Sequence, residues 1–150
     1  MVEQKEYIRD GRAPIPEKEI TSKVMSSIKD RNTKPELLLR RALWGNNIRG
    51  YRLHWKKVPG RPDIAFPGKK IAVFVNGCFW HRCPHCQPKL PNSNSDFWQN
   101  KFEKNVARDK KKLLLLKELE WKILVLWECQ IKSSVHRCIE LVSHKINEKY

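Results

Sequence analysis

The chain has few acidic residues and no long apolar segment. Its 150 residues include 16 Asp and Glu against 31 Lys and Arg, which gives a formal net charge of +15. No apolar run approaches the roughly 20 residues of a membrane span. The charged N-terminus also lacks the apolar stretch of a signal peptide. We therefore expect a cytoplasmic protein without a membrane association, and the excess positive charge predicts a polyanion such as nucleic acid as its partner.

Cysteines are too few, and odd in number, for a complete set of internal disulfides. There are five, and in the cytosol cysteines more often bind a metal or stay free. Cys78, Cys83 and Cys86 lie within nine residues of one another, a spacing that lets them converge on one tetrahedral Zn²⁺. The expected fourth ligand is Cys129, at the end of a predicted strand, with His85 as its rival. This zinc ion would be structural, because a closed four-ligand site leaves no open position for catalysis.

The chain shows no internal repeat and no low-complexity tract, and its length is typical of a single domain. Residues 1–16 are polar, contain two prolines and predict a flexible N-terminal arm. Residues 17–150 then form the domain, beginning with a short helix over residues 17–28. Nothing in the sequence requires an oligomer, so we expect a monomer.

Patterning along the domain predicts an α/β fold. Thr33-Lys34-Pro35-Glu36 is typical of a helix start with a capping box, and this helix should end near Gly45. Alternation and turn residues predict strands over residues 51–55, 63–66 and 70–76, the last two joined by a turn at Pro67-Gly68. A long helix over about 95–119, a buried strand over 121–127 and a last helix from about 133 follow. Because a helix connects the third and fourth strands, they should be parallel, in a mixed sheet flanked by helices.

Two residues near the ends of the predicted strands are candidates for hydrolytic chemistry. Asp63 lies at the mouth of a strand, where a carboxylate can bind a hard cation such as Mg²⁺ together with phosphate oxygens. The next strand leads toward His81, which is either a base that accepts a proton from water or a further zinc ligand. Cys138, among apolar neighbours, is expected to be a buried small hydrophobic residue.

Three aromatic residues are not explained by helix or strand patterning. Phe79 and Trp80 lie in a segment bounded by Gly, Cys and Pro, for which we expect a loop, and Trp98 follows several Asn and Ser residues. Such side chains either belong to the core or act as apolar wedges that enter a base step of DNA.

The motifs together closely resemble the very short patch repair (Vsr) DNA mismatch endonucleases, in order from about Thr21 to Cys129. The segments that carry the resemblance are Gly60-Arg61-Pro62-Asp63, Asn76-Gly77-Cys78-Phe79-Trp80-His81, Asp96-Phe97-Trp98, Lys104-Asn105-Val106-x-Arg108-Asp109 and Val125-Leu126-Trp127-Glu128-Cys129. The resemblance implies a restriction-endonuclease-like fold in a bacterial protein. It also implies Mg²⁺-dependent nicking on the 5′ side of the thymine in a T:G mismatch, which arises when 5-methylcytosine deaminates.

Roles for individual residues follow from the resemblance. Asp63 matches the metal-binding aspartate, and His81 the histidine that activates the attacking water. Asp109 and Glu36 match further acidic residues of the active site. The remaining matches are Phe79, Trp80 and Trp98 as aromatics that enter the duplex, Cys78, Cys83, Cys86 and Cys129 as the zinc site, and Lys23, Met25 and Arg61 as DNA contacts. Implied partners are a cytosine-5 methyltransferase system and mismatch-repair proteins.

The sequence departs from the family pattern near the metal site. Val75 occupies a position that supplies a second metal contact, and valine offers only its main-chain carbonyl. Asn76 replaces a His or Asp, and the zinc loop has Cys83 and one extra residue before Cys86. Two alternatives therefore stay open beside a mismatch endonuclease. One is a sequence-specific restriction endonuclease on the same core, and the other is a zinc-stabilised DNA-binding module without catalysis.

Overall fold

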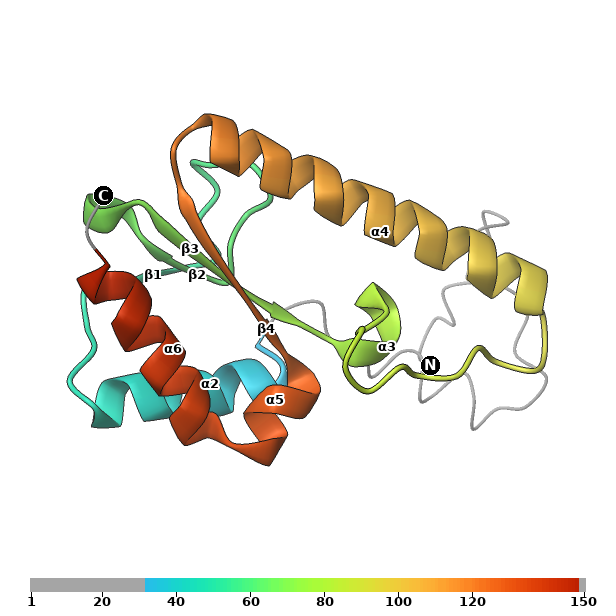
Figure 1. Ribbon diagram of the computed structural model, residues 1–150, viewed down its shortest axis with the longest axis horizontal. Helices are drawn as coiled ribbons and strands as arrows, with labels where there is room; N and C mark the ends of the chain where they lie inside the picture. The colour runs from blue at the N-terminus through green and yellow to red at the C-terminus, as the bar shows by residue number, and fades with distance from the viewer. Residues whose placement is uncertain (1–31, 149–150) are drawn as a thin grey trace, which may run out of the picture.

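A mixed four-stranded sheet forms the centre of the protein, whose computed structural model describes residues 32–148 (Figure 1). The strands lie in the order β1 (Arg52–Leu53), β2 (Ile64–Phe66), β3 (Ile71–Asn76) and β4 (Lys122–Trp127). β2 is antiparallel to β1 and β3, whereas β3 and β4 are parallel. The predicted α/β class, mixed sheet and parallel pair are confirmed. The predicted arm over 1–16, the helix over 17–28, Lys23 and Met25 lie outside the described residues.

The first strand is shorter than the predicted 51–55. His54 has a φ of 45°, outside the β region, and this ends the regular strand after Leu53. The backbone stays attached to the sheet, because the N–H groups of His54 and Trp55 donate to the carbonyls of Asp63 and Pro62 at 3.0 and 3.2 Å. This bend brings His54 beside the start of β2.

Alternate residues of the strands face two separate apolar clusters. Ile64, Val73 and Leu126 belong to the cluster that includes residues of α2 (Lys34–Gly45), α5 (Glu128–Ser133) and α6 (Val135–Asn147). Ala65, Ala72 and Phe74 face the opposite way and pack with Leu116 of α4 (Ser95–Glu118). Figure 1 shows the long helix α4 on one side of the sheet and α2, α5 and α6 on the other. Both faces are therefore covered, as the buried strands require.

The helix α2 begins as its sequence predicts. The Thr33 hydroxyl accepts a hydrogen bond from the Glu36 N–H at 3.4 Å, and Pro35 occupies the first turn. The Glu36 carboxylate accepts from the N–H of Asn32 at 2.8 Å instead of that of Thr33. Only half of the expected capping box is therefore present, and the Glu36 side chain is directed toward the sheet.

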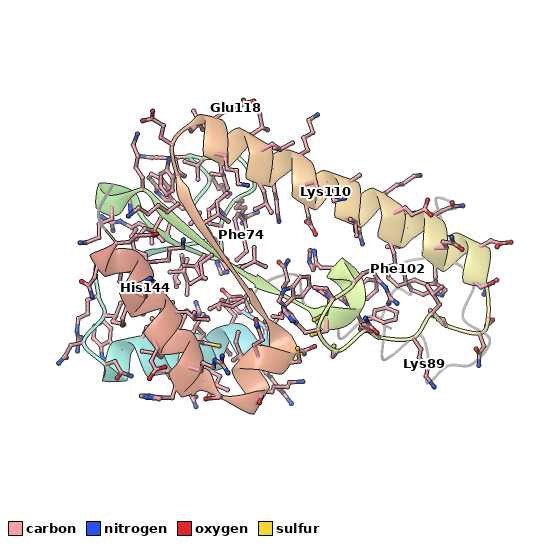
Figure 2. All side chains as sticks on the ribbon, viewed as in Figure 1. Phe74, Lys89, Phe102, Lys110, Glu118 and His144 are labelled. Carbon is pink, nitrogen blue, oxygen red and sulfur yellow. The ribbon has the colours of Figure 1, made fainter. Side chains whose placement is uncertain are left out.

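The face of α4 that packs against the rest of the protein carries aromatic, polar and aliphatic residues in turn. Trp98 and Phe102 at its start are buried against aromatic residues, and Leu116 near its end is buried against the sheet. Between them, at helical spacing, lie Asn105, Asp109 and Lys112, all partly buried. In Figure 2, Phe102 lies by the first half of α4, and Phe74 lies on the sheet. A single helix face thus supplies apolar packing at its ends and polar groups in the middle.

One predicted loop is helical in the structure, and one short helix was not predicted. Residues predicted as a loop form a helical turn, α3 (Cys78–His81), which ends at Arg82 in the left-handed conformation (φ 55°). The last helix is present as predicted and is α6, whereas α5 is a short helix that the sequence analysis did not predict. Ser134 separates the two, because it is extended (φ −157°) and its side chain caps α6 by accepting the Arg137 N–H at 3.3 Å. Cys138 is buried in α6, as predicted. No helix among residues 32–148 has the length and apolar character to span a membrane.

Candidate active site and cysteine cluster

A pocket of about 250 Å³ opens where the start of β2, the end of β3, α3 and α4 meet. It contains Asp63 and His81, which lie 18 residues apart in the sequence and which the sequence analysis assigned to one site. Its lining residues are His54, Gly60, Arg61, Asp63, Phe74, Val75, Asn76, His81 and Lys112. Carboxylate, imidazole and ammonium groups therefore share one cavity.

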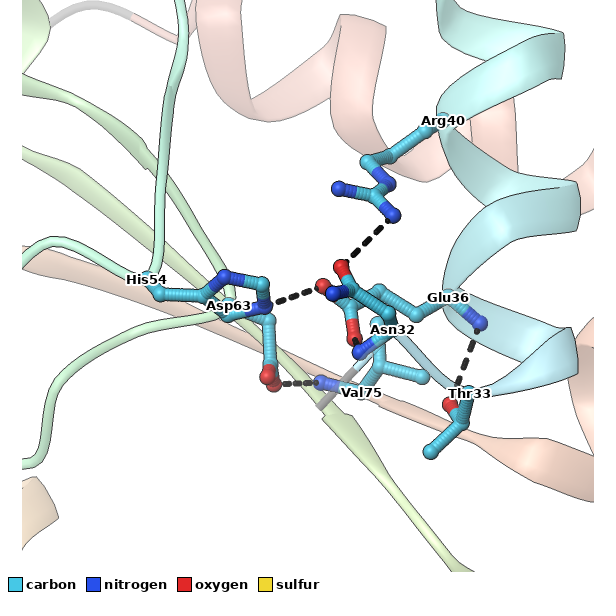
Figure 3. Close-up of polar contacts among 7 residues, drawn as sticks. All are labelled: Asn32, Thr33, Glu36, Arg40, His54, Asp63 and Val75. Carbon is cyan, nitrogen blue, oxygen red and sulfur yellow. Dashed lines mark hydrogen bonds and ion pairs between the residues drawn. The ribbon is translucent and has the colours of Figure 1, made fainter. Parts of the chain in front are cut away.

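Asp63 precedes β2 and is held by the neighbouring strand. Its Oδ2 accepts a hydrogen bond from the main-chain N–H of Val75 at 2.8 Å (Figure 3). Burial raises the pKa of Asp63 above its usual value, and the nearby Glu36 raises it further, although the Val75 N–H opposes this. The predicted contribution of Val75 was its carbonyl, and the structure adds a role for its N–H, which orients the carboxylate. A buried carboxylate with a raised pKa favours an adjacent cation.

Glu36 and His54 form a buried pair beside Asp63. His54 Nε2 lies 2.6 Å from Glu36 Oε1, and because a carboxylate only accepts, Nε2 carries the proton (Figure 3). The ligand atoms of Glu36, His54 and Asp63 all lie within 4.8 Å of one another. Two carboxylates and an imidazole at this separation fit a divalent cation. The sequence analysis missed His54, although its place at the end of a strand near Asp63 was a usable signal.

His81 is oriented by an acidic partner on α4. Its Nδ1 donates to Asp109 Oδ2 at 2.6 Å, which leaves Nε2 as the acceptor in the neutral ring. Burial would raise the pKa of Asp109, but its hydrogen bond with His81 and the charges of His81 and Lys112 outweigh burial and lower it. One turn earlier on α4, the Asn105 amide donates to the Trp80 carbonyl at 3.2 Å and holds α3 in place. These two contacts explain why Asn105 and Asp109 occur four residues apart.

Lys112 is a second residue of the pocket that the sequence analysis missed. Its ammonium lies 3.3 Å from Asp109 Oδ1, and its side chain is 20% exposed. The signal that could have found it is the helical spacing from Asp109, because residues i and i+3 share a helix face. Arg61 also lines the pocket but is exposed, with a left-handed backbone (φ 46°).

The three predicted DNA-entering aromatics lie together between α3 and α4. Phe79 contacts Trp80 and Trp98 at ring-centroid distances of 5.0 and 5.6 Å, and Trp80 contacts Trp98 at 5.8 Å. Phe102 of α4 completes this aromatic cluster. None of the four belongs to the two apolar clusters that pack against the sheet. Trp80 is only partly buried and is the residue next to His81.

Four cysteines form a group with the geometry of a metal site. The sulfur atoms of Cys78, Cys83, Cys86 and Cys129 all lie within 4.8 Å of one another, and His85 is not part of this group. Cys83 Sγ and Cys129 Sγ are 3.7 Å apart. A tetrahedral zinc ion with Zn–S bonds of about 2.3 Å places its sulfur atoms about 3.8 Å apart. All five cysteines are free of disulfides, so this separation fits a shared metal ion.

Backbone N–H groups donate to two sulfur atoms of this cluster and favour the thiolate at Cys83, whereas burial raises the pKa of Cys78 and Cys129. The N–H of Cys129 donates to Cys78 Sγ at 3.3 Å, and the N–H of His85 donates to Cys83 Sγ at 3.4 Å. Burial alone would raise the pKa of Cys83, but the N–H groups of Cys86 and His85 lower it. A thiolate is the form of cysteine that binds metals. His85 therefore contributes a backbone donor to the cluster.

Comparison with known proteins shows that the chain is similar to DNA endonucleases. Residues 14–87 match the family model described as DNA mismatch endonuclease Vsr. The type II nicking enzyme V.XorIIP of Xanthomonas oryzae is 40% identical over 108 residues, which cover 72% of this chain and 79% of the relative. V.NmeAIP of Neisseria meningitidis, also a type II nicking enzyme, is 38% identical, with 83% and 88% covered. The DNA mismatch endonuclease Vsr of Escherichia coli is 34% identical, with 91% and 86% covered.

Proposed function

The chain belongs to the Vsr DNA mismatch endonuclease family, and we propose that it nicks duplex DNA on the 5′ side of the thymine in a T:G mismatch. The observation that carries the proposal is the pocket in which the Asp63 carboxylate meets the His81–Asp109 pair, directly beside a partly exposed aromatic cluster. Hydrolysis of a phosphodiester needs a cation site and a base, and mismatch recognition needs groups that part stacked bases.

The cation site consists of the carboxylates near the start of β2. Asp63 would hold the cation, with the Val75 carbonyl as a further main-chain ligand and Glu36 beside them. Bound Mg²⁺ would polarise the scissile phosphate and offset its negative charge. The donor set fits, because the oxygens of Glu36 and Asp63 lie close together and burial raises the pKa of Asp63, so that an adjacent cation would favour its carboxylate. His54, which donates to Glu36 at 2.6 Å, orients that carboxylate.

His81 acts as the general base. Because Nδ1 donates to Asp109, Nε2 is free to accept a proton from the attacking water. The water oxygen forms a bond to phosphorus as its proton passes to Nε2. One phosphodiester P–O bond breaks, and the leaving oxygen takes a proton from water. Asp109 keeps the ring in the required tautomer and stabilises the imidazolium that forms.

The aromatic cluster supplies mismatch recognition. Phe79, Trp80 and Trp98 enter the duplex beside the mismatch, where a T:G pair is easier to unstack than a matched pair. Arg61 binds the phosphate backbone, and the net charge of +15 attracts DNA. Lys23 and Met25, outside the described residues, are assigned to the DNA groove by the family resemblance.

The cysteine cluster holds a structural Zn²⁺ in this proposal. Cys78 lies at the start of α3, Cys83 and Cys86 follow that turn, and Cys129 is in α5 after β4. The ion would join these segments and so fix α3, which carries Trp80 and His81. The mixed sheet with α4 on one side fits a restriction-endonuclease-like fold. We place the enzyme as a monomer in the bacterial cytoplasm, with a cytosine-5 methyltransferase system and mismatch-repair proteins as its partners.

The test is a nicking assay on labelled duplexes that differ in one base pair. The protein and Mg²⁺ are incubated with T:G duplexes in several sequence contexts and with matched T:A controls, alongside the Asp63→Ala variant. We expect a nick only in the mismatched duplex, 5′ to the thymine, and none with Asp63→Ala despite retained binding. Double-strand cleavage of T:A duplexes would indicate a restriction endonuclease, and binding without any cleavage would indicate a non-catalytic DNA-binding module. Either result would reject the proposed function.

A further inference from the structure

Lys112 is a cation of the pocket to which neither the family resemblance nor the mechanism above assigns a role. Its ammonium lies 3.3 Å from Asp109 Oδ1 and 4.4 Å from the centre of the Phe74 ring. It lines the same pocket as Asp63 and His81. These two contacts already order the long lysine side chain, so a further contact with a ligand costs little additional conformational entropy.

Its neighbours on α4 differ from it. Lys110 and Lys111 are exposed to solvent, whereas Lys112 is partly buried. The stem of Lys112 crosses Gly60 so closely that a Cβ added there would lie 2.9 Å from Lys112 Cδ. Gly60, whose φ is +79°, thus leaves room for this one lysine. The loop before Asp63 and the packed face of α4 are fitted to each other at Lys112.

Several carboxylates surround Lys112, so a phosphate that binds in this pocket needs a cation beside it. The described pocket brings Lys112 together with the carboxylate of Asp63, and Glu36 and Asp109 lie just behind its lining. A DNA phosphate that enters adds more negative charge, which the transition state of its hydrolysis spreads over the phosphoryl oxygens. Lysine has three N–H donors, and the contact with Asp109 uses one. The same ammonium can therefore also donate to a phosphate oxygen.

We propose that Lys112 is a catalytic residue that contacts a nonbridging oxygen of the scissile phosphate and stabilises the charge that accumulates there as water attacks. This inference rests on the proposed function, and it adds the Lys112 ammonium to the groups that act on the phosphate. Preorganised cations aimed at developing charge act in this way in other phosphoryl-transfer sites. The chain thus holds the phosphate from the α4 side while Asp63 lies on the sheet side.

The first test compares two lysines of one helix turn. Lys112→Met keeps the unbranched stem against Gly60 and Phe74 but removes the charge, and Lys111→Met is its exposed matched control. Single-turnover nicking of a T:G duplex at saturating protein should slow by about 10²–10³-fold for Lys112→Met and stay unchanged for Lys111→Met. Lys112→Arg, which keeps the charge, should recover part of the rate. Equal rates for the two Met variants would overturn the proposal.

A second measurement separates contact with the phosphate from an indirect effect through Asp109. Binding is measured in Ca²⁺ for a T:G duplex with its normal phosphate 5′ to the thymine and for one with a neutral methylphosphonate there. The wild-type chain should lose affinity on this replacement, and the loss should be about tenfold smaller for Lys112→Met. The same loss in both proteins would show that Lys112 makes no contact with this phosphate, and would overturn the proposal even if nicking were slowed.

The two measurements also judge the proposed function independently. If the wild-type chain nicks the T:G duplex but the loss of affinity on methylphosphonate replacement does not depend on Lys112, the proposed function stands and the phosphate contact is rejected. If the wild-type chain does not nick but the loss of affinity depends on Lys112, the phosphate contact stands and the proposed function is rejected. Failure of both measurements would reject both.

Discussion

Replacement of Asp109 by Asn tests the base assigned to His81. The substitution keeps the size of the side chain but removes the charge that accepts from His81 Nδ1 at 2.6 Å. An amide can turn its NH₂ group toward Nδ1, and this would move the ring proton to Nε2. In that tautomer Nε2 has no lone pair to accept the proton of water. The variant should therefore bind DNA normally and fail in the proton-transfer step.

The size of the expected effect follows from this geometry. General base catalysis contributes about 10²–10⁴-fold to a rate, and the wrong tautomer removes that contribution. Single-turnover nicking should slow by the same factor, equivalent to about 2.7–5.5 kcal/mol in activation free energy. The change in folding free energy should be smaller, about 1–3 kcal/mol, because one partly buried hydrogen-bond donor loses its charged acceptor.

The assay uses saturating protein and labelled T:G duplex, so that binding does not limit the rate. Duplex affinity in Ca²⁺ and thermal unfolding are measured on the same preparations. Glu103→Gln is the matched control, because it also removes one carboxylate from α4 but at an exposed position. A rate for Asp109→Asn within about threefold of the control would refute the reasoning, since it lies far below the factor expected for a base.

Three further predictions concern the metals and the aromatic cluster. Zinc content should be about one ion per chain and fall sharply in Cys83→Ser but not in Cys138→Ala; equal zinc in both variants would contradict the assigned ligands. Trp80→Ala should reduce the preference for T:G over T:A duplex by about 1–3 kcal/mol, roughly 5- to 150-fold, whereas Trp44→Ala, exposed on α2, should leave the preference unchanged. Asp63→Asn should raise the melting temperature at pH 7 in metal-free buffer. Burial raises the pKa of Asp63 in the folded protein. Relative to the variant, the wild type is therefore most stable at a pH below the usual pKa of Asp, and it loses this stability as the pH rises through the raised pKa. A gain that persists at a pH well below the usual Asp value would refute this account.

The order and type of the main elements were predictable from local patterns. The Thr33 cap and Pro35 mark the start of α2, and a helix of 24 residues between β3 and β4 makes those strands parallel. These features depend on residues close in sequence, for which the backbone has few alternatives. The convergence of Cys78, Cys83 and Cys86 is of the same kind, because a short segment brings its cysteines close together.

The tertiary structure decided features that depend on distant residues. Cys83 and Cys129 are separated by 46 positions and meet only because α5 follows the end of β4 beside β3. His54 reaches Glu36 across 18 positions because the backbone bends at the end of β1. The helical turn of α3, predicted as a loop, is pinned by Asn105 of α4.

Lys112 shows most clearly that the local sequence does not decide which residue faces the pocket. In the sequence it is one of three consecutive lysines with the same local preferences. Only the packing of α4 over the sheet turns one of them toward the pocket and leaves the other two in solvent. The sequence alone therefore determined the order of the main elements and several residues of the site, among them Asp63 and His81. The packing of those elements decided which charges face one another, because the interaction between charges depends on their distance in space.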